Sequence, residues 1–271
     1  MSAPAFAKWQ GLGNHYLVVE RGAWPFPLTA ARAALLCDPH FGVGGDGVLE
    51  VVTGGRAPEM IVWNPDGSNA ESCGNGIRMV ARHLAMTGRL PADGRIVTGA
   101  GPVHVDVRDD GTVAVAMGRA RFPAGEGRER LAVAGGEVEL TEVSMGNPHA
   151  VIVHPDPDGA VRAIGPEVEV ASRFPARTNV ELIRAEGPSE LTMRVWERGV
   201  GVTMACGTGA CAAAVAAVRL GGLVSPVTVH LAGGDLVIAV DDDLEVTMTG
   251  PAAPLYEGVI SADLAARLEA A

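Results

Sequence analysis

The chain repeats itself at a fixed spacing of 133 residues, the distance from Cys73 to Cys206. Each of these cysteines is followed by a Gly-x-Gly sequence. Without a gap, the same offset aligns Gly13-Asn14 with Gly146-Asn147, Val62-Trp63 with Val195-Trp196 and Asp109-Asp110 with Asp242-Asp243. So many matches at one offset indicate two copies of one structural unit. We therefore predict two domains, residues 1–117 and 118–252, followed by a C-terminal tail, residues 253–271.

Most of each copy has the pattern of short β-strands. Runs such as YLVVE, MIVWN and VHVDV in the first copy, and HAVIVH, NVELI and LTMRVWE in the second, are rich in β-branched residues and are separated by turns that contain Gly, Pro or Asp. One main helix is predicted after each cysteine, closed by Gly88 or Gly221 as a C-cap glycine. A short capped helix is predicted after Ser261. The pattern indicates an α+β fold made by internal duplication.

The two predicted main helices differ in their apolar surface. In the first, Ile77, Val80, Ala81 and Leu84 lie on one face at helical spacing. The second is apolar on all sides, from Ala210 to Val218, and we expect it to be buried.

Composition excludes several classes of function. There are 32 acidic and 21 basic residues, for a formal net charge of -11, and no basic cluster, so nucleic acid is not an expected partner. The start of the chain lacks the pattern of a signal peptide and no run is long enough to span a bilayer, so we expect a cytoplasmic protein without a membrane partner. Four cysteines are too few for a disulfide scaffold.

No cofactor or metal is expected. Lys8 is the one lysine, and it lies in a predicted strand, which is a poor place for the Schiff-base lysine of a pyridoxal phosphate enzyme. The glycine run at 42–48 leads into a strand rather than a helix, which does not favour a phosphate cradle. No CxxC pair accompanies Cys73 or Cys206, so a zinc site is not indicated.

The two glycine-framed cysteines point to acid/base chemistry. The N-terminus of a helix presents free N–H groups and the positive end of the helix dipole, which stabilise a thiolate. Duplication implies a pseudo-twofold axis that would place the two thiols on opposite faces of one carbon atom, as stereoinversion requires. Two other interpretations stay open: a redox disulfide between Cys73 and Cys206, and, for Cys37 and Cys211, simple burial as small apolar residues.

The motifs resemble those of the diaminopimelate epimerase family, which consists of cofactor-independent amino-acid epimerases of lysine and cell-wall biosynthesis. The resemblance covers nearly the whole chain through GLGNHYLVV, FGVGGDGVL, NPDGSNAESCGNGIR, MGNPHAVI, RTNVELI and WERGVGVTMACGTGACA. It implies two similar domains, each a mostly antiparallel, barrel-like sheet around a central helix, with the tail packed on the first domain. It also implies a homodimer and the interconversion of LL- and meso-diaminopimelate, with Cys73 and Cys206 as the two bases.

The resemblance also implies which residues contact this small-molecule substrate. Glu197 and Arg198 would bind its distal amino-acid end, because a carboxylate pairs with an ammonium group and a guanidinium pairs with a carboxylate. His149, together with Glu197, is a candidate for tuning the two thiols. The remaining expected contacts are Asn14, Asn64, Gly74, Asn75, Asn147, Asn179, Gly207 and Thr208.

Two positions depart from the pattern of the family. Gly47 stands where many members carry glutamine, and Val202 stands where glutamate is usual. These departures affect the expected contacts to the substrate amine and leave the cysteines unchanged. A proline or hydroxyproline racemase is the alternative enzyme, although proline has no distal charged end for Glu197 and Arg198 to bind. A non-catalytic, redox-sensing binding protein on the same scaffold is the alternative outside enzymes.

Overall fold

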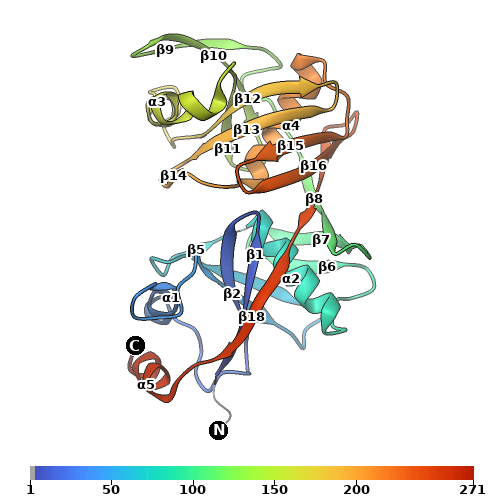
Figure 1. Cartoon of the computed structure of the whole chain (residues 1–271). Helices are drawn as coiled ribbons and strands as arrows, with labels where there is room; N and C mark the ends of the chain where they lie inside the picture. Colours follow the sequence, from blue (N-terminus) through green and yellow to red (C-terminus); the bar gives the residue numbers. More distant parts are fainter. Residues whose placement is uncertain (1–3, 72) are drawn as a thin grey trace. The chain divides into compact units, whose positions relative to one another are not determined.

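The computed structural model describes residues 4–71 and 73–271; residues 1–3, and Ser72 of the first cysteine motif, lie outside the described part. The chain separates into two compact units (Figure 1). Unit 1 comprises Met1–Val115 and Pro251–Ala271, and unit 2 comprises Ala116–Gly250. The C-terminal segment therefore belongs to the same unit as the N-terminus.

The sheet of unit 1 is mixed. Its strands pair in the order β18-β1-β2-β3-β4-β6-β7-β8, and β5 also pairs with β4. The pairs β2–β3 and β4–β6 are parallel, and the other described pairs are antiparallel. The strands are β1 (Ala5–Gly11), β2 (Asn14–Glu20), β3 (Val48–Val52), β4 (Glu59–Trp63), β5 (Asn69–Ala70), β6 (Arg95–Thr98), β7 (Gly101–Val107), β8 (Thr112–Arg119) and β18 (Ala253–Val259). Strand β8 continues past Val115, so its last part belongs to unit 2.

Unit 2 repeats this topology. Its strands pair in the order β9-β10-β11-β12-β13-β15-β16-β17, β14 also pairs with β13, and the pairs β11–β12 and β13–β15 are parallel. The parallel pairs fall at the same steps as in unit 1, which confirms the duplication. The strands are β9 (Glu129–Val133), β10 (Gly136–Ser144), β11 (Pro148–Val153), β12 (Asn179–Gly187), β13 (Glu190–Glu197), β14 (Gly201–Val202), β15 (Val227–Leu231), β16 (Gly234–Val240) and β17 (Glu245–Pro251).

Each unit has a central helix packed against several of its strands, α2 (Gly74–Met86) in unit 1 and α4 (Gly207–Gly221) in unit 2. The predicted apolar face of α2 is buried, and α4 is buried from Gly209 to Ala217, as expected for a helix that is apolar all round. Gly88 follows α2 in the left-handed region, at φ 67°, as predicted. The prediction for Gly221 is wrong: Gly221 is the last residue of α4, and the C-cap is Gly222, whose φ of 76° a glycine adopts without a Cβ clash.

Two helices join parallel strands and were not predicted from the sequence. Helix α1 (Ala30–Cys37) connects β2 to β3, and α3 (Pro157–Glu169) connects β11 to β12. A crossover is needed at each place because parallel neighbours cannot be joined by a tight hairpin. The predicted C-terminal helix is confirmed as α5 (Ala262–Ala270), whose N-cap Ser261 accepts a hydrogen bond from Leu264 N at 3.2 Å. Its Leu268 is part of the apolar core of unit 1.

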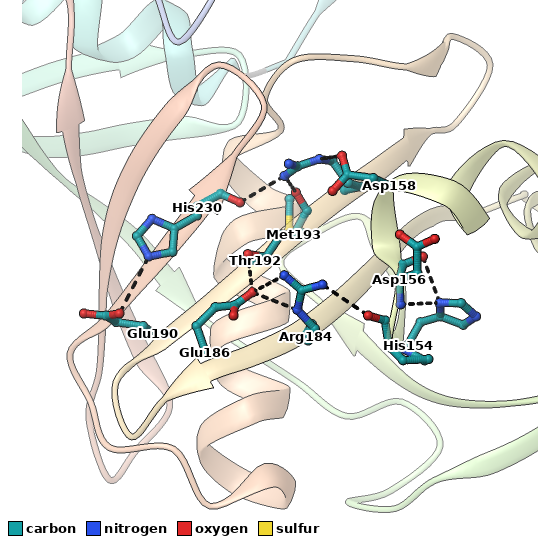
Figure 2. A network of polar contacts seen from close by, with 11 residues as sticks. His154, Asp156, Asp158, Arg184, Glu186, Glu190, Thr192, Met193 and His230 are labelled. Atoms are coloured by element: carbon teal, nitrogen blue, oxygen red, sulfur yellow. Dashed lines mark hydrogen bonds and ion pairs between the residues drawn. The ribbon is translucent and has the colours of Figure 1, made fainter.

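A polar network fastens the β12–β13 hairpin of unit 2 to the start of α3 (Figure 2). Arg184 donates to Glu186 on the same strand and to the carbonyl of Pro155, at 2.7 and 3.2 Å. Arg194 donates to Asp158 at 2.6 Å and to the carbonyl of His230 at 3.3 Å. These side chains satisfy one another, so we assign the network a structural role.

Candidate active site

In unit 1, Cys73 is the N-cap residue of α2. Its backbone is extended, with φ -146° and ψ 108°, and its sulfur accepts a hydrogen bond from Gly76 N at 3.3 Å. A cysteine thus takes the place that serine or aspartate usually occupies at a helix N-terminus. The Sγ atom also lies 3.5 Å from the hydroxyl oxygen of Tyr16 on β2. The sulfur is therefore held between a backbone donor and a phenol, and it is partly exposed.

Gly76 is required by packing around this sulfur. A Cβ atom at Gly76 would lie 2.8 Å from Cδ2 of Leu49 and 3.4 Å from the Sγ of Cys73. Any side chain here would displace the thiol or the strand below it. The Gly-x-Gly sequence therefore brings the first turn of α2 close to the thiol and to β3.

Asn75 points into unit 1 rather than into solvent. The side chain is 4% exposed, and its Oδ1 accepts from the buried guanidinium of Arg78 at 2.7 Å. Arg78 also donates to the carbonyls of Gly74 and Pro251, at 3.3 and 3.2 Å. Arg78 therefore fastens the first turn of α2 in place, and the side chain of Asn75 is already engaged in that task.

Asn14 and Asn64, both expected to contact substrate, lie at strand ends in unit 1. Asn14 begins β2 after a tight turn in which Leu12 and Gly13 have positive φ. Asn64 follows β4, and its Nδ2 donates to the Ser68 hydroxyl at 3.0 Å. The turn after Asn64 leads through β5 to Cys73.

The structure leaves no room for a side chain at Gly47. A Cβ there would lie 2.6 Å from the carbonyl oxygen of Trp63 and 2.6 Å from Cε1 of Tyr16. A side chain at this position would therefore collide with the ring of Tyr16 or with the end of β4.

In unit 2, Cys206 is the N-cap residue of α4, with φ -123° and ψ 113°. The residue is 8% exposed, and its Sγ lies 3.6 Å from Oγ1 of Thr208 in the first turn of the helix. Gly209 repeats the role of Gly76: a Cβ there would lie 3.3 Å from the Cys206 sulfur and 2.7 Å from Oε1 of Glu181. Both cysteines are N-cap residues with an extended backbone, but the Cys73 sulfur accepts a capping hydrogen bond and Cys206 makes no such side-chain capping bond in the described structure. The side chain beneath the helix also differs, Leu49 in unit 1 and Glu181 in unit 2.

His149 lies in a buried hydrogen-bond network of unit 2. Its Nδ1 is 2.7 Å from Oε1 of Glu181, and both side chains are fully buried. Its Nε2 is 3.1 Å from Oδ1 of Asn147, whose Nδ2 donates to Oγ1 of Thr208 at 3.3 Å. The structure thus joins the predicted residues His149, Asn147 and Thr208 to the neighbourhood of Cys206.

Glu197 is the last residue of β13 in unit 2, and Arg198 is the first residue of the turn that follows. Glu197 accepts a hydrogen bond from the hydroxyl of Thr203, and Arg198 is exposed, with Nη1 donating to the carbonyl of Ala176 at 3.3 Å. Asn179 holds this strand end, because its Oδ1 accepts from Arg198 N at 3.0 Å and its Nδ2 donates to the carbonyl of Pro148 at 3.0 Å. Asn179 therefore joins the Pro148 strand to the Arg198 turn.

Burial and nearby charges shift the pKa values of Cys206 and Glu197 in unit 2. Burial raises the pKa of the Cys206 thiol well above its usual range, and the carboxylates of Glu197 and Glu181 raise it further. Burial also raises the pKa of the Glu197 carboxyl, against the hydrogen bond from Thr203. Cys206 is therefore mainly a thiol at neutral pH in the free protein. Burial raises the pKa of Cys37 to about 11, as expected of an inert cysteine, and Cys211 is fully buried inside α4.

Three residues of these half-sites were missed by sequence reasoning: Tyr16, Arg78 and Glu181. Tyr16 and Glu181 lie in apolar strand runs, YLVV and NVELI, and Arg78 lies in a helix. The sequence signal that could have revealed them is a polar residue within a run of residues expected to be buried. Glu181 breaks the apolar run of β12, and such a carboxylate is rarely buried without a partner.

Comparison with known proteins identifies a family. The model described as diaminopimelate epimerase matches residues 6–123 and 141–254, which contain both cysteine motifs. The chain belongs to the diaminopimelate epimerase family. A diaminopimelate epimerase of Synechococcus sp. (strain JA-3-3Ab) is 44% identical over 276 residues, covering 94% of this chain and 97% of that protein.

Solved structures of more distant proteins share the fold. A PhzF-family phenazine biosynthesis protein of Bacillus anthracis has a TM-score of 0.73 at 15% identity, covering 96% of this chain and all of that one. A probable proline racemase of Agrobacterium radiobacter K84 has a TM-score of 0.71 at 14% identity, covering 96% and 93%. The predicted α+β fold of two duplicated units is confirmed. None of the described helices is both long and apolar enough to cross a membrane.

Proposed function

We propose that this chain interconverts LL- and meso-diaminopimelate as a cofactor-independent isomerase, with Cys73 and Cys206 as its two acid/base groups. The observation that carries the proposal is the family match across both units, combined with a thiol at the N-terminus of each central helix. A glycine at the third helical position of each motif brings the helix close to the sulfur.

The reaction is a proton exchange at the α-carbon. A thiolate on one face takes the α-proton, and the electron pair of the broken C–H bond is left on the α-carbon, delocalised into the carboxylate. The second cysteine, as a thiol, donates a proton to the opposite face, which inverts the centre. The free backbone N–H groups of Gly74, Asn75, Gly207 and Thr208 are suited to bind the carboxylate on which negative charge accumulates.

The rest of the substrate would be bound by polar side chains near the strand ends. We assign the distal carboxylate to the exposed guanidinium of Arg198, and the distal ammonium to Glu197. Asn14, Asn64 and Asn147 present amide groups that both donate and accept. The amide of Asn179 makes one hydrogen bond through its oxygen and one through its nitrogen to the backbone. We assign its remaining acceptor and donor positions to substrate binding as well.

We also propose a pathway, a cellular location and an oligomeric state for the enzyme. Its product would serve lysine and peptidoglycan-precursor biosynthesis, which suits a cytoplasmic enzyme, and we propose that it acts as a homodimer. Sedimentation analysis of the purified protein tests the dimer.

Proton NMR in deuterated water tests the reaction. The wild-type protein is expected to exchange the α-proton of LL-diaminopimelate and to form the meso isomer, and Cys73→Ala or Cys206→Ala is expected to abolish both. Cys211→Ala is the matched control, because Cys211 is buried inside α4, the helix that Cys206 caps, and this variant is expected to keep activity. Full activity of either variant at the N-caps would contradict the mechanism.

Proline is the control substrate, because a proline racemase shares the fold. Exchange at the α-carbon of proline, without exchange in diaminopimelate, would establish the alternative enzyme. Exchange in neither, with reversible formation of a Cys73–Cys206 disulfide, would favour the redox-sensing protein.

A further inference from the structure

Glu169 is a buried carboxylate of unit 2 to which the proposed reaction gives no role. It is the last residue of α3 and is 6% exposed. Its Oε2 accepts a hydrogen bond from the indole Nε1 of Trp196 at 2.6 Å, and its Oε1 accepts from Gly199 N at 2.8 Å. Nη1 of Arg177 donates to the same Oε1 at 3.4 Å. Indole, backbone amide and guanidinium groups only donate, so the direction of all three hydrogen bonds is fixed.

The stability of α3 does not explain this carboxylate. A negative charge in the last turn of a helix lies at the negative end of the helix dipole, which is unfavourable. Burial alone would raise the pKa of Glu169, but the hydrogen bonds from Trp196 and Gly199 and the charge of Arg177 outweigh it and hold the pKa below its ordinary value. The carboxylate is therefore ionised at neutral pH, and the groups that stabilise it lie outside the helix.

The equivalent tryptophan of unit 1 is satisfied in a different way. Trp63 and Trp196 are 133 residues apart, and Nε1 of Trp63 donates to Oε2 of Glu50 on β3 at 3.1 Å. The other oxygen of Glu50 accepts from Nε of Arg21 at 2.8 Å. An indole at this place in the fold can thus be satisfied from within the sheet. What sets the carboxylate of unit 2 apart is its contact with the turn that follows the tryptophan.

That turn carries Arg198, and two side chains from other parts of unit 2 hold its backbone. Oδ1 of Asn179 accepts from Arg198 N at 3.0 Å, and Oε1 of Glu169 accepts from Gly199 N at 2.8 Å. Gly199 has φ 75°, a left-handed conformation that favours glycine. Two successive N–H groups are thus fixed, which determines where the side chain of Arg198 leaves the backbone.

Glu169 also contacts the second segment that holds Arg198. The guanidinium of Arg198 donates from Nη1 to the carbonyl of Ala176 at 3.3 Å, in the connection between α3 and β12. Arg177, the next residue of that connection, donates to the carboxylate of Glu169. The carboxylate therefore links the segment that the guanidinium contacts to the turn from which it extends.

Helix α3 comes close enough for these contacts because residue 165 is glycine. A Cβ atom at Gly165 would lie 2.5 Å from Cβ and 2.7 Å from Cγ of Trp196. Glu169 follows four residues later, so it lies on the same face of the helix, one turn further along. The close packing of α3 on the end of β13 thus brings the carboxylate to the turn.

We infer that Glu169 is a positioning residue, which fixes Arg198 for binding the distal carboxylate of the substrate by holding both the turn at Gly199 and the connection at Arg177. In this assignment Glu169 itself does not touch the substrate. The inference rests on the proposed function, in which Arg198 binds that carboxylate.

Glu169→Met tests this role, because it removes the carboxylate and keeps a side chain of similar length. We expect KM for LL-diaminopimelate to rise about tenfold, the lower end of the value of a charge-assisted hydrogen bond, and kcat to stay within about twofold of wild type. The two constants separate because Arg198 binds the distal end of the substrate and takes no part in proton transfer. Initial rates over a range of substrate concentrations measure both constants.

The Arg198→Gln background separates positioning from a general structural role. The guanidinium is already absent there, so adding Glu169→Met is expected to change KM by less than about twofold. Damage that extends beyond Arg198 would persist in this background. Glu167→Gln is the matched control: Glu167 is an exposed carboxylate near the same end of α3, it accepts from Ala134 N at 2.6 Å, and its loss should leave both constants unchanged.

Hydrogen–deuterium exchange of residues 197–200, in the protein without substrate, measures the hold of Glu169 on the turn independently of turnover. Glu169→Met is expected to speed amide exchange in this segment by about tenfold or more, because Gly199 N loses its acceptor. If Glu169→Met does not fold, Glu169→Asp takes its place. It keeps the charge but withdraws the carboxylate by one methylene group, and the same changes are expected at roughly threefold.

An unchanged KM in Glu169→Met, a rise in KM that persists in the Arg198→Gln background, or unchanged amide exchange at residues 197–200 would each overturn the inference. A wild-type protein that does not exchange the α-proton of diaminopimelate would instead refute the proposed function. Faster amide exchange in the variant would still show, in that case, that Glu169 holds the turn of Arg198.

Discussion

Tyr16 and Cys73 lie side by side in unit 1, with 3.5 Å between the phenol oxygen and the sulfur. The ring of Tyr16 also fills the space that a side chain at Gly47 would need. In the duplication, Tyr16 is equivalent to His149 of unit 2, which lies 133 residues later. Each unit therefore places a polar ring near its cysteine motif. The phenol of Tyr16 contacts the sulfur of Cys73 directly, whereas the imidazole of His149 is linked to Cys206 only through Asn147 and Thr208.

Tyr16→Phe is expected to lower kcat about tenfold. The phenol can donate to the Cys73 thiolate, and a hydrogen bond to a charged group is worth about 1.5 kcal/mol, which corresponds to that factor in rate. Initial rates of epimerisation at saturating diaminopimelate measure the effect. Tyr256→Phe removes a phenol oxygen from β18 and serves as the control, with unchanged kcat expected. Equal rates for the two variants would show that the contact with Cys73 has no role in the reaction.

Gly76→Ala and Gly209→Ala are each expected to reduce activity by at least tenfold, because the added Cβ forces the N-terminal turn away from the thiol or the strand beneath it. The collisions are with Leu49 at 2.8 Å and with Glu181 at 2.7 Å. Gly221→Ala is the control within α4, where a Cβ meets only the Cβ of Ala217, at 3.9 Å. There we expect normal activity and a gain in stability of about 0.5 kcal/mol. Thermal unfolding and initial rates for the three variants distinguish these outcomes.

The sequence was sufficient for those features that depend on local pattern. The repeat spacing predicted the duplication, alternating β-branched runs predicted the strands, and the cysteine before Gly-x-Gly predicted the start of each central helix. Helix α3 was not predicted because Pro166 lies in its interior and because Gly159 and Gly165 interrupt its helical periodicity. Helix α1 has eight residues, too few to show a clear period.

The residues of the half-sites that were not predicted depend on tertiary neighbours. Glu181 reads as one polar residue in a strand, and only the pairing of β11 with β12 and the close approach of Gly209 bring it to His149 and Cys206. Arg78 reads as a polar residue on a helix, although it is fully buried by its contacts with Asn75 and Pro251. Sequence periodicity carries no information on such pairings.

The fall in the free energy of unfolding at acidic pH is expected to depend on Glu20 in unit 1. This carboxylate accepts hydrogen bonds from Arg89 and from His83, the latter at 2.9 Å, and the Arg89 hydrogen bonds hold its pKa at about 2, against an ordinary value of 4.5. Because the folded pKa is lowered, the stabilisation is fully present above pH 4.5 and is lost as pH falls towards 2.

Glu20→Gln is therefore expected to destabilise the protein by about 1 kcal/mol at pH 7, after allowance for solvent screening, and by almost nothing at pH 2. Denaturant unfolding across this pH range measures the difference. Glu257→Gln on β18 changes an exposed carboxylate and is expected to show little effect at any pH. A Glu20 effect that is constant with pH would contradict the assignment.

Arg198→Gln is expected to lower kcat/KM for diaminopimelate by ten- to a hundredfold, mainly through KM. The backbone of Arg198 is fixed by Asn179, at 3.0 Å, while its guanidinium is exposed, so the substitution removes a charge without disturbing the core. A charge-assisted contact with the distal carboxylate is worth about 1.5–3 kcal/mol. Arg184→Gln, in the polar network of Figure 2, removes an arginine that pairs with Glu186 and should leave both constants unchanged. If Arg198→Gln retains wild-type KM, the guanidinium does not bind the distal end, and specificity for a diamino diacid must come from other residues.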